Sequence, residues 1–466
     1  MKQFDLNIEK ILENWETHHA IREIIANSLD EQLLTNTKDV EITKQNNSWH
    51  IKDYGRGLRY TNLTQNENQE KLSNQKVIGK FGIGLKDALA TFDRKGIKVL
   101  AKSKYGDITL SKTSKEGFAD IITLHASISD PTDTNFIGTE FIINGATDED
   151  ISKAKNLFLR FTGEQIIETT KAGDIVNKIG SCGKIYINGV KVAEEENFLF
   201  SYNITQLTAA IKKSLNRERS NVGRTAYTDS VKRILLGCKS TNVAKALADD
   251  LQNINYGTAH DELSWIDVQE HSVKILNQNE KVLFVTSMDI MLHPDMIEEA
   301  KESGHQIISI PENLKEKIKG GLDFSGKPII DISQFATDYN ESFSFEFVAI
   351  ENLTKDEREV FNLTDEILNL IDGKPKIVKN IKISTTMRKD FFLENETVGI
   401  WESSTSSIII LRKMLNSVKD YAGTLIHEAI HAKSGLGDIG RSFEHELTIA
   451  IGQVCEKALT KKKSWL

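Results

Sequence analysis

At residues 23–30 the sequence is Glu23-Ile24-Ile25-Ala26-Asn27-Ser28-Leu29-Asp30. Apolar residues recur around this segment at about 3.6-residue spacing, and the pattern predicts a helix over residues 7–34. Glu23 and Asn27 are four residues apart, so their side chains lie on one face of that helix. The amide oxygen of such a pair can hold a metal ion while the carboxylate takes a proton from water. A solvated helix face is the alternative interpretation.

Two glycine-containing segments follow. They are Ile51-Lys52-Asp53-Tyr54-Gly55-Arg56-Gly57-Leu58 and Gly79-Lys80-Phe81-Gly82-Ile83-Gly84-Leu85-Lys86-Asp87. In the first, Asp53 can accept a hydrogen bond from an exocyclic amine, and the glycines let the backbone approach a flat ring. A simple turn is the alternative. The second opens a predicted helix over residues 84–93, where backbone N–H groups, the helix dipole and Lys86 favour phosphate oxygens. It is not a Walker A loop, because Gly-Lys-Ser/Thr is missing.

The segments around these motifs predict a sheet and a loop. Residues 39–52 predict two short strands, and residues 97–143 alternate apolar and polar residues as meandering strands do. Residues 61–76 are dense in Asn and Gln, which predicts a mobile loop.

In this order, the three motifs resemble those of the GHKL (Bergerat-fold) ATPases, which include gyrase B, MutL, the ninety-kilodalton heat-shock chaperone and the MORC proteins. The matching positions are Glu23, Asn27 and Asp30 for the N-box, Asp53, Gly55 and Gly57 for the adenine box, and Gly79, Gly82 and Gly84 for the lid-end box. A later segment, Gly138-Thr139-Glu140-Phe141, is similar to the family's Gly-Thr-x-Phe element, which places a threonine near the adenine. The resemblance covers residues 1–150.

This resemblance implies an α/β sandwich that binds ATP with Mg²⁺. Glu23 would activate water, Asn27 would ligate Mg²⁺, and Asp53 would contact adenine. The segment 59–79 would be the ATP lid, and a homodimer would form on ATP binding, as in many relatives.

In several relatives a second domain supplies a cation to the γ-phosphate. Arg217 and Arg219 are the candidates here, because an arginine stabilises the charge that develops in phosphoryl transfer. A charged helix end is the alternative.

Beyond the ATPase domain of residues 1–150, the pattern predicts three further domains. Residues 151–238 form a transducer-like domain, in which a strand at 183–190 carries an Asn-Gly hairpin signal. Residues 239–340 contain a βαβ unit without phosphate-loop glycines. Residues 341–466 form the C-terminal domain.

The C-terminal domain contains Thr424-Leu425-Ile426-His427-Glu428-Ala429-Ile430-His431-Ala432. The pattern predicts a helix over residues 420–433, and His427 and His431, four residues apart, point the same way. Both imidazoles can therefore reach one Zn²⁺, and Glu428 can take a proton from water on that ion. A structural helix with two paired histidines is the alternative.

This stretch resembles the compact gluzincin peptidases, in which a Glu on the next helix completes the zinc site. The resemblance covers residues 341–466 and assigns the third ligand to Glu444, with Glu446 and His445 as alternatives. Peptidases of this class hold an extended substrate on an exposed edge strand, and the segment 404–411 is the candidate. The expected fold class is multi-domain α/β and α+β: a Bergerat-fold sandwich, a transducer-like segment, a βαβ-containing middle and a zincin-like C-terminal domain.

Composition limits the classes of function. Lys and Arg total 59 against 67 Asp and Glu, and this formal charge of -8 argues against a nucleic-acid partner, although a local basic face remains an alternative. The 3 cysteines are far apart and form no CxxC, which fits a reducing compartment. There is no signal-peptide pattern and no run of 18 apolar residues, so no membrane partner and a cytoplasmic location are expected.

The leading hypothesis is an ATPase domain that controls a zinc-dependent peptidase acting on an intracellular protein or peptide. ATP binding would close the lid and dimerise the N-terminal domains, changing access to the zinc site. The architecture resembles bacterial defence or stress-response systems. The alternative is an ATP-driven dimeric clamp, of the chaperone or DNA-remodelling type, with a structural or degenerate zinc site.

Overall fold

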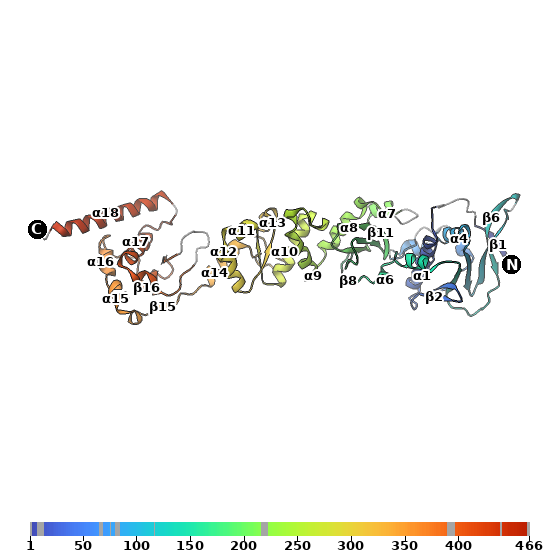
Figure 1. The fold of residues 1–466 in the computed structure, drawn as a ribbon, viewed down its shortest axis with the longest axis horizontal. Coiled ribbons are helices and arrows are strands. Elements are labelled where there is room, and N and C mark those ends of the chain that lie inside the picture. Colours follow the sequence, from blue (N-terminus) through green and yellow to red (C-terminus); the bar gives the residue numbers. More distant parts are fainter. Residues whose placement is uncertain are drawn as a thin grey trace. The chain divides into compact units, whose positions relative to one another are not determined.

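A computed structural model describes residues 2–6, 14–64, 69–74, 76–79, 84–115, 117–215, 222–388, 397–438 and 440–463. The chain forms two compact units of mixed α/β structure (Figure 1). The first unit comprises residues 1–280, 316–318 and 322–327, and the second comprises the remainder. The boundary between the units therefore lies inside the predicted middle domain. The finer division into four domains stays a prediction.

The first unit begins with a seven-stranded antiparallel sheet in the order β1-β6-β5-β4-β7-β3-β2. Its strands are β1 (Lys2–Asp5), β2 (Glu41–Gln45), β3 (Ser48–Lys52), β4 (Lys98–Ser103), β5 (Gly106–Lys115), β6 (Phe118–Ser129) and β7 (Thr139–Asn144). The helices α1 (Thr17–Thr35), α4 (Gly84–Arg94) and α5 (Asp148–Lys155) pack against it. Their apolar side chains share one core with the sheet, in which Ile24 of α1 and Phe92 of α4 lie with Ile51 and Phe141. The predicted α/β layers and strands are confirmed, whereas β1 was not predicted.

Helix α1 begins at Thr17, later than the predicted start at residue 7; residues 7–13 lie outside the described residues. The first turn is closed by two hydrogen bonds: the backbone N–H of Glu16 donates to Nδ1 of His19, and the backbone N–H of His19 donates to the Glu16 carbonyl, both at 3.0 Å. At the other end Asn36 takes the left-handed conformation (φ 53°), which terminates helices. Periodicity alone did not reveal the start, because apolar spacing continues upstream of it.

The predicted loop at residues 61–76 contains two short helices, α2 (Thr61–Thr64) and α3 (Gln69–Ser73). The backbone N–H of Arg59 donates to Oδ1 of Asn62 at 2.9 Å, and Ser73 Oγ donates to the carbonyl of Glu70 at 2.9 Å. Short polar side chains here hydrogen-bond the backbone at turns and helix ends. The same composition was therefore misjudged as a continuous loop.

The first unit continues with a five-stranded sheet in the order β11-β10-β12-β9-β8. Its strands are β8 (Ile166–Thr169), β9 (Gly173–Val176), β10 (Gly183–Ile187), β11 (Val190–Glu195) and β12 (Ser201–Ile204). The accompanying helices are α6 (Leu159–Thr162), α7 (Ala209–Ser214), α8 (Arg224–Leu236), α9 (Thr241–Leu251) and α10 (Ile266–Asn279). The predicted hairpin is confirmed: β10 and β11 pair around Asn188 and Gly189, whose φ angles are 47° and 80°.

The second unit opens with the predicted βαβ arrangement. Strands β13 (Val282–Val285) and β14 (Gln306–Ser309) pair in parallel, with α11 (Ser287–Leu292) and α12 (Pro294–Glu302) between them in the chain. Helices α13 (Glu312–Ile318) and α14 (Ile332–Ser342) follow.

The C-terminal sheet has the order β15-β16-β18-β17. Its strands are β15 (Phe347–Val348), β16 (Asn380–Ser384), β17 (Gly399–Glu402) and β18 (Ser407–Leu411). The surrounding helices are α15 (Lys355–Phe361), α16 (Thr364–Asn369), α17 (Val418–Ser434) and α18 (Arg441–Lys463). The prediction of an edge strand at 404–411 was wrong, because β18 is buried throughout and pairs on both sides. A continuous apolar run belongs to a central strand, and β17 forms the edge.

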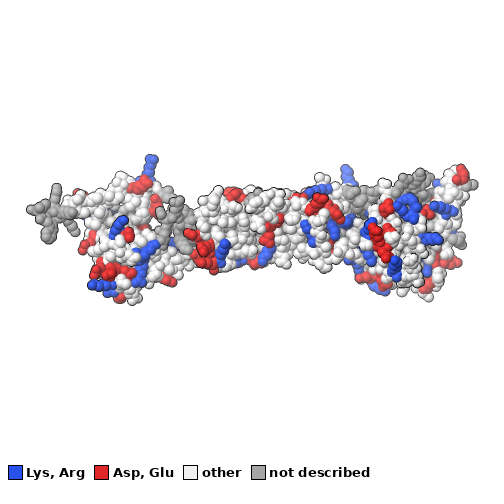
Figure 2. All heavy atoms as spheres, viewed as in Figure 1, with Lys and Arg blue, Asp and Glu red and all other residues white. Residues whose placement is uncertain are grey.

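Basic and acidic side chains are interspersed over the face drawn in Figure 2. In the part of the chain that the structure describes, no helix has the length and apolar character needed to cross a membrane.

Candidate nucleotide site and candidate metal centre

The carboxylate of Asp53 is held at the end of β3 by backbone groups. Its Oδ1 accepts hydrogen bonds from the N–H groups of Gly55 at 3.0 Å and Thr139 at 3.2 Å. The backbone N–H of Asp53 donates to the Thr139 carbonyl at 2.9 Å, which ties β3 to β7 at this point. Burial raises the pKa of Asp53 to about 6, against the lowering effect of these hydrogen bonds. A buried acceptor fixed in this way suits the exocyclic amine of adenine.

Glycine is required beside this carboxylate. A Cβ on Gly138 would lie 1.9 Å from the carbonyl oxygen of Asp53, and Gly138 has a φ of 79°. Gly57 also has a positive φ, 89°, and packs against the Gly138 carbonyl. The two backbone segments could not approach this closely with side chains at these positions.

Asn27 and Asp30 face a cation. The Nζ atom of Lys71, in α3, lies 3.1 Å from Oδ1 of Asn27 and 3.0 Å from Oδ2 of Asp30. The amide nitrogen of Asn27 donates to the Glu23 carbonyl at 2.9 Å, which turns the amide oxygen outward from the helix. An oxygen that already contacts an ammonium group is suited to Mg²⁺, which prefers oxygen ligands. These residues therefore fit the predicted Mg²⁺ role of Asn27.

Glu23 is buried, and its Oε1 accepts hydrogen bonds from Nε and Nη2 of Arg22 at 3.1 and 2.9 Å. Its other oxygen, Oε2, would lie 2.2 Å from a Cβ on Gly84. Glycine at the first position of α4 thus lets the helix N-terminus reach this carboxylate. Lys86 lies half-buried in the first turn of the same helix.

The structure brings together most residues of the predicted nucleotide site. Asp30 accepts hydrogen bonds from the backbone N–H groups of Ile78 at 2.6 Å and Gly79 at 2.7 Å, so α1 holds the end of the predicted lid segment. Gly82, Arg217 and Arg219 lie outside the described residues. Sequence reasoning missed Lys71, because a lysine in an Asn/Gln-rich segment carries no distinguishing signal.

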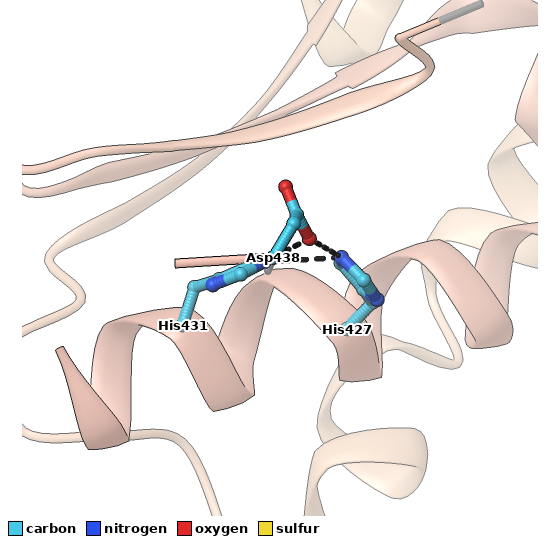
Figure 3. Close-up of side chains that lie close together, drawn as sticks. All are labelled: His427, His431 and Asp438. Atoms are coloured by element: carbon cyan, nitrogen blue, oxygen red, sulfur yellow. Dashed lines mark hydrogen bonds and ion pairs between the residues drawn. The ribbon is translucent and has the colours of Figure 1, made fainter. Parts of the chain in front are cut away.

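His427, His431 and Asp438 converge at one point (Figure 3). Oδ1 of Asp438 lies 2.9 Å from Nε2 of each histidine, and the two Nε2 atoms are 3.0 Å apart. Both histidines project from α17, whereas Asp438 follows Gly435, where the helix ends in a left-handed turn (φ 70°). That turn directs the chain back over the histidines.

This donor set fits a divalent metal ion. Nδ1 of His431 lies 2.7 Å from the carbonyl oxygen of Leu436, which can only accept a hydrogen bond, so Nδ1 carries a proton. In the neutral ring Nε2 then presents its lone pair to a metal ion. Tetrahedral ligands at about 2.0–2.1 Å from Zn²⁺ lie about 3.3 Å apart, close to the spacing found here. Two imidazoles and one carboxylate are also an established zinc ligand set.

Glu428 is buried next to this group. Burial raises its pKa to about 7, while His431 and a hydrogen bond from the backbone N–H of Trp401 act in the opposite direction. Trp401 belongs to β17, so the edge strand contacts the carboxylate directly. A Cβ on Gly399 in the same strand would lie 2.4 Å from Cγ2 of Thr424 and 3.0 Å from Cγ of Glu428, which shows how closely β17 approaches α17.

Glu444, the predicted third ligand, is exposed near the start of α18, and Asp438 takes the third place in the group found among the described residues. His445 is exposed and Glu446 half-buried, and neither belongs to that group. The preceding residue, Phe443, faces the site: its ring stacks on His431 with centroids 4.0 Å apart. The signal that was overlooked is a carboxylate placed shortly after the glycine that ends the histidine helix.

Residues 15–139 match the histidine kinase-, DNA gyrase B- and HSP90-like ATPases. The first domain is therefore of this ATPase class, which implies the use of ATP and Mg²⁺. Residues 149–241 match the Mycoplasma pneumoniae MPN635 N-terminal domain.

An uncharacterized protein of Mycoplasma pneumoniae is 42% identical to this chain over 240 residues, which cover 50% of the chain and 97% of the relative. The chain belongs to the family of that protein. A second uncharacterized protein of the same organism is 25% identical over 341 residues, covering 67% of the chain and 94% of the relative. A third uncharacterized protein of this organism is 27% identical over 180 residues, which cover 37% of the chain and 93% of the relative.

Proposed function

We propose that ATP binding by the N-terminal domain controls a zinc-dependent peptidase in the C-terminal domain, which acts on an intracellular protein or peptide. The observation that carries the proposal is the convergence of His427, His431 and Asp438 beside the buried carboxylate of Glu428. A carboxylate oxygen at 2.9 Å from both rings supplies the third donor that a catalytic zinc site needs.

In the nucleotide site, Asp53 would bind the adenine amine and Asn27 would ligate Mg²⁺. Glu23 would orient and deprotonate the attacking water, because its carboxylate lies at the N-terminus of α4, where phosphate groups bind favourably. The N-terminal domains would pair as a homodimer when ATP is bound.

At the metal centre, zinc would supply a Lewis acid for hydrolysis of a peptide bond. Glu428 would accept a proton from water and return it to the leaving amine.

The edge strand β17 would hold the substrate. It pairs antiparallel with β18 on one side, with Trp401 opposite Ile408, and among the described residues no strand pairs with it on the other. An extended peptide can add to such an edge through main-chain hydrogen bonds. Because the N–H of Trp401 already donates to Glu428, a peptide would pair with the neighbouring residues of β17 and lie beside the base.

The test is a search for new peptide termini by mass spectrometry. Zinc-loaded protein is incubated with lysate of its own host, with and without ATP and Mg²⁺. Glu428→Gln is compared in parallel, with Glu444→Gln as a matched control on the exposed face of α18. New termini that change with ATP, fall at least about 100-fold in Glu428→Gln and persist in the control are expected.

Termini that do not depend on Glu428, in both nucleotide states, contradict the peptidase. ATP-dependent dimerisation without Glu428-dependent cleavage would instead identify an ATP-driven clamp.

A further inference from the structure

The lid carries a lysine into the nucleotide site. Lys71 belongs to α3, and its ammonium group contacts both Oδ1 of Asn27 and Oδ2 of Asp30, at 3.1 and 3.0 Å. The side chain of Lys71 is 16% exposed and that of Asp30 is 1% exposed. This is a largely buried ion pair and not a surface contact, so removing one partner has a measurable cost.

Two other contacts hold the lid in this position. Arg56, in the adenine box, contacts Glu70 of α3 at 2.9 Å and Glu31 of α1 at 2.9 Å. Asp30 also accepts hydrogen bonds from the backbone N–H groups of Ile78 and Gly79 at the end of the lid. Lys71 therefore adds a charge to a segment that is already docked on α1.

We propose that Lys71 is a built-in competitor of Mg²⁺ for the side-chain oxygen of Asn27. This inference rests on the use of ATP and Mg²⁺ by the N-terminal domain. A Mg²⁺ ion binds oxygen at about 2.0–2.1 Å. An ammonium nitrogen 3.1 Å from the same oxygen would lie within about 5 Å of that ion, and the two cations repel each other.

Entry of the nucleotide-bound Mg²⁺ consequently requires Lys71 to leave Asn27. Because this ion pair helps to dock α3 on α1, the departure of Lys71 weakens the docking of the lid helix. Mg²⁺ binding at Asn27 and docking of the lid are thereby coupled. One state has Lys71 on Asn27 and the lid docked, and the other has Mg²⁺ on Asn27 and the lid released. The nucleotide shifts the balance toward the state that it binds more tightly.

The first test measures binding of a non-hydrolysable ATP analogue to the full chain by calorimetry over a series of Mg²⁺ concentrations. In Lys71→Gln the Mg²⁺ concentration for half-maximal binding is expected to fall about three- to tenfold. Lys71→Arg keeps the charge and is expected to behave more like the wild type. The control is Lys76→Gln, which removes an exposed charge from the same lid.

An unchanged Mg²⁺ requirement in Lys71→Gln overturns the competition. Weaker binding of the analogue by the same factor with and without Mg²⁺ also overturns it, because Lys71 would then be a phosphate contact. A wild-type protein that binds no nucleotide at any Mg²⁺ concentration refutes the ATP function itself, and the inference with it.

The second test needs no nucleotide. Hydrogen exchange of peptides that cover Ile78 and Gly79 is expected to be faster in Lys71→Gln than in the wild type and in Lys76→Gln, because loss of the ion pair loosens the docked lid. Equal exchange in all three proteins would contradict a role for Lys71 in holding the lid. The rest of the exchange map shows whether the variant is folded.

Discussion

The Nε2 atom of His431 lies 2.9 Å from Oδ1 of Asp438, a residue in the loop after the histidine helix. The proton on Nδ1 of His431 is committed to the Leu436 carbonyl, so this short contact needs either a metal ion between Nε2 and Oδ1 or a second proton on Nε2. The pair adds a third donor to the candidate metal centre, which the HExxH spacing alone does not supply.

Asp438→Ala is expected to weaken zinc binding at least about tenfold, because it removes one of the three proposed protein ligands. Glu444→Ala is the matched control, an exposed carboxylate on the following helix, and should bind zinc as the wild type does. Calorimetric titration of the metal-free protein with zinc measures both. If Glu444→Ala loses zinc and Asp438→Ala does not, the site has the ligand first predicted from sequence.

Gly399→Ala is expected to reduce peptide cleavage while leaving zinc content unchanged. A methyl group at this position would lie 2.4 Å from Cγ2 of Thr424, a branched side chain on the helix, so β17 must move away from α17. That movement would separate Trp401 from Glu428. Metal analysis and a cleavage assay on the same preparation distinguish loss of zinc from loss of substrate positioning. Cleavage at the wild-type rate would show that β17 does not position the substrate.

Gly138→Ala is expected to lower the free energy of unfolding by about 2 kcal/mol or more, because the left-handed backbone strain is joined by a clash with Asp53. Gly163→Ala isolates the strain: its φ of 78° matches the 79° of Gly138, but nothing lies within 4 Å of the added methyl group. It should cost about 1 kcal/mol. Urea denaturation measures the free energy of unfolding of both variants and of the wild type. Equal decreases in the two variants would argue against the close approach of Gly138 to Asp53.

The affinity for nucleotide is expected to fall as the pH is lowered through about 6. Burial raises the pKa of Asp53 to about 6, so its carboxylate gains a proton there and no longer accepts fully from the adenine amine. Between pH 7.5 and 5.5 the ionised fraction falls about fourfold. The affinity for Mg²⁺-saturated ADP is measured at several pH values. Its dependence on pH should become flatter in Asp53→Asn. A wild-type slope retained by that variant would place the titrating group elsewhere.

The raised pKa of Asp53 also affects the free energy of unfolding, which is expected to be higher at low pH, where nucleotide binding is weaker. The pKa of Asp53 in the folded chain lies above 3.8, the ordinary pKa of an aspartate side chain, so folding is favoured most below that pH. This contribution is lost as the pH rises through about 6. Asp53→Asn is therefore expected to unfold at a higher urea concentration than the wild type at pH 7.5 while binding nucleotide poorly. Lower stability at that pH would show that the ionised carboxylate is compensated by its hydrogen bonds.

Short-range features of this chain were predictable from sequence. The hairpin at Asn188 and Gly189, the strands at residues 39–52 and the parallel pair β13–β14 all follow from local turn chemistry and side-chain periodicity. The pairing of His427 with His431 is also local, because a four-residue spacing on any helix places two side chains together.

Contacts between distant segments were decided only by tertiary structure. Asp438 joins the histidines through the turn at Gly435, and Lys71 of α3 reaches Asn27 of α1. The edge strand proved to be β17 and not the more apolar β18, since the most buried run takes the centre of the sheet. Spacing along the chain determines which side chains share a helix or a hairpin, whereas which helix, loop or strand lies opposite depends on how the whole core packs.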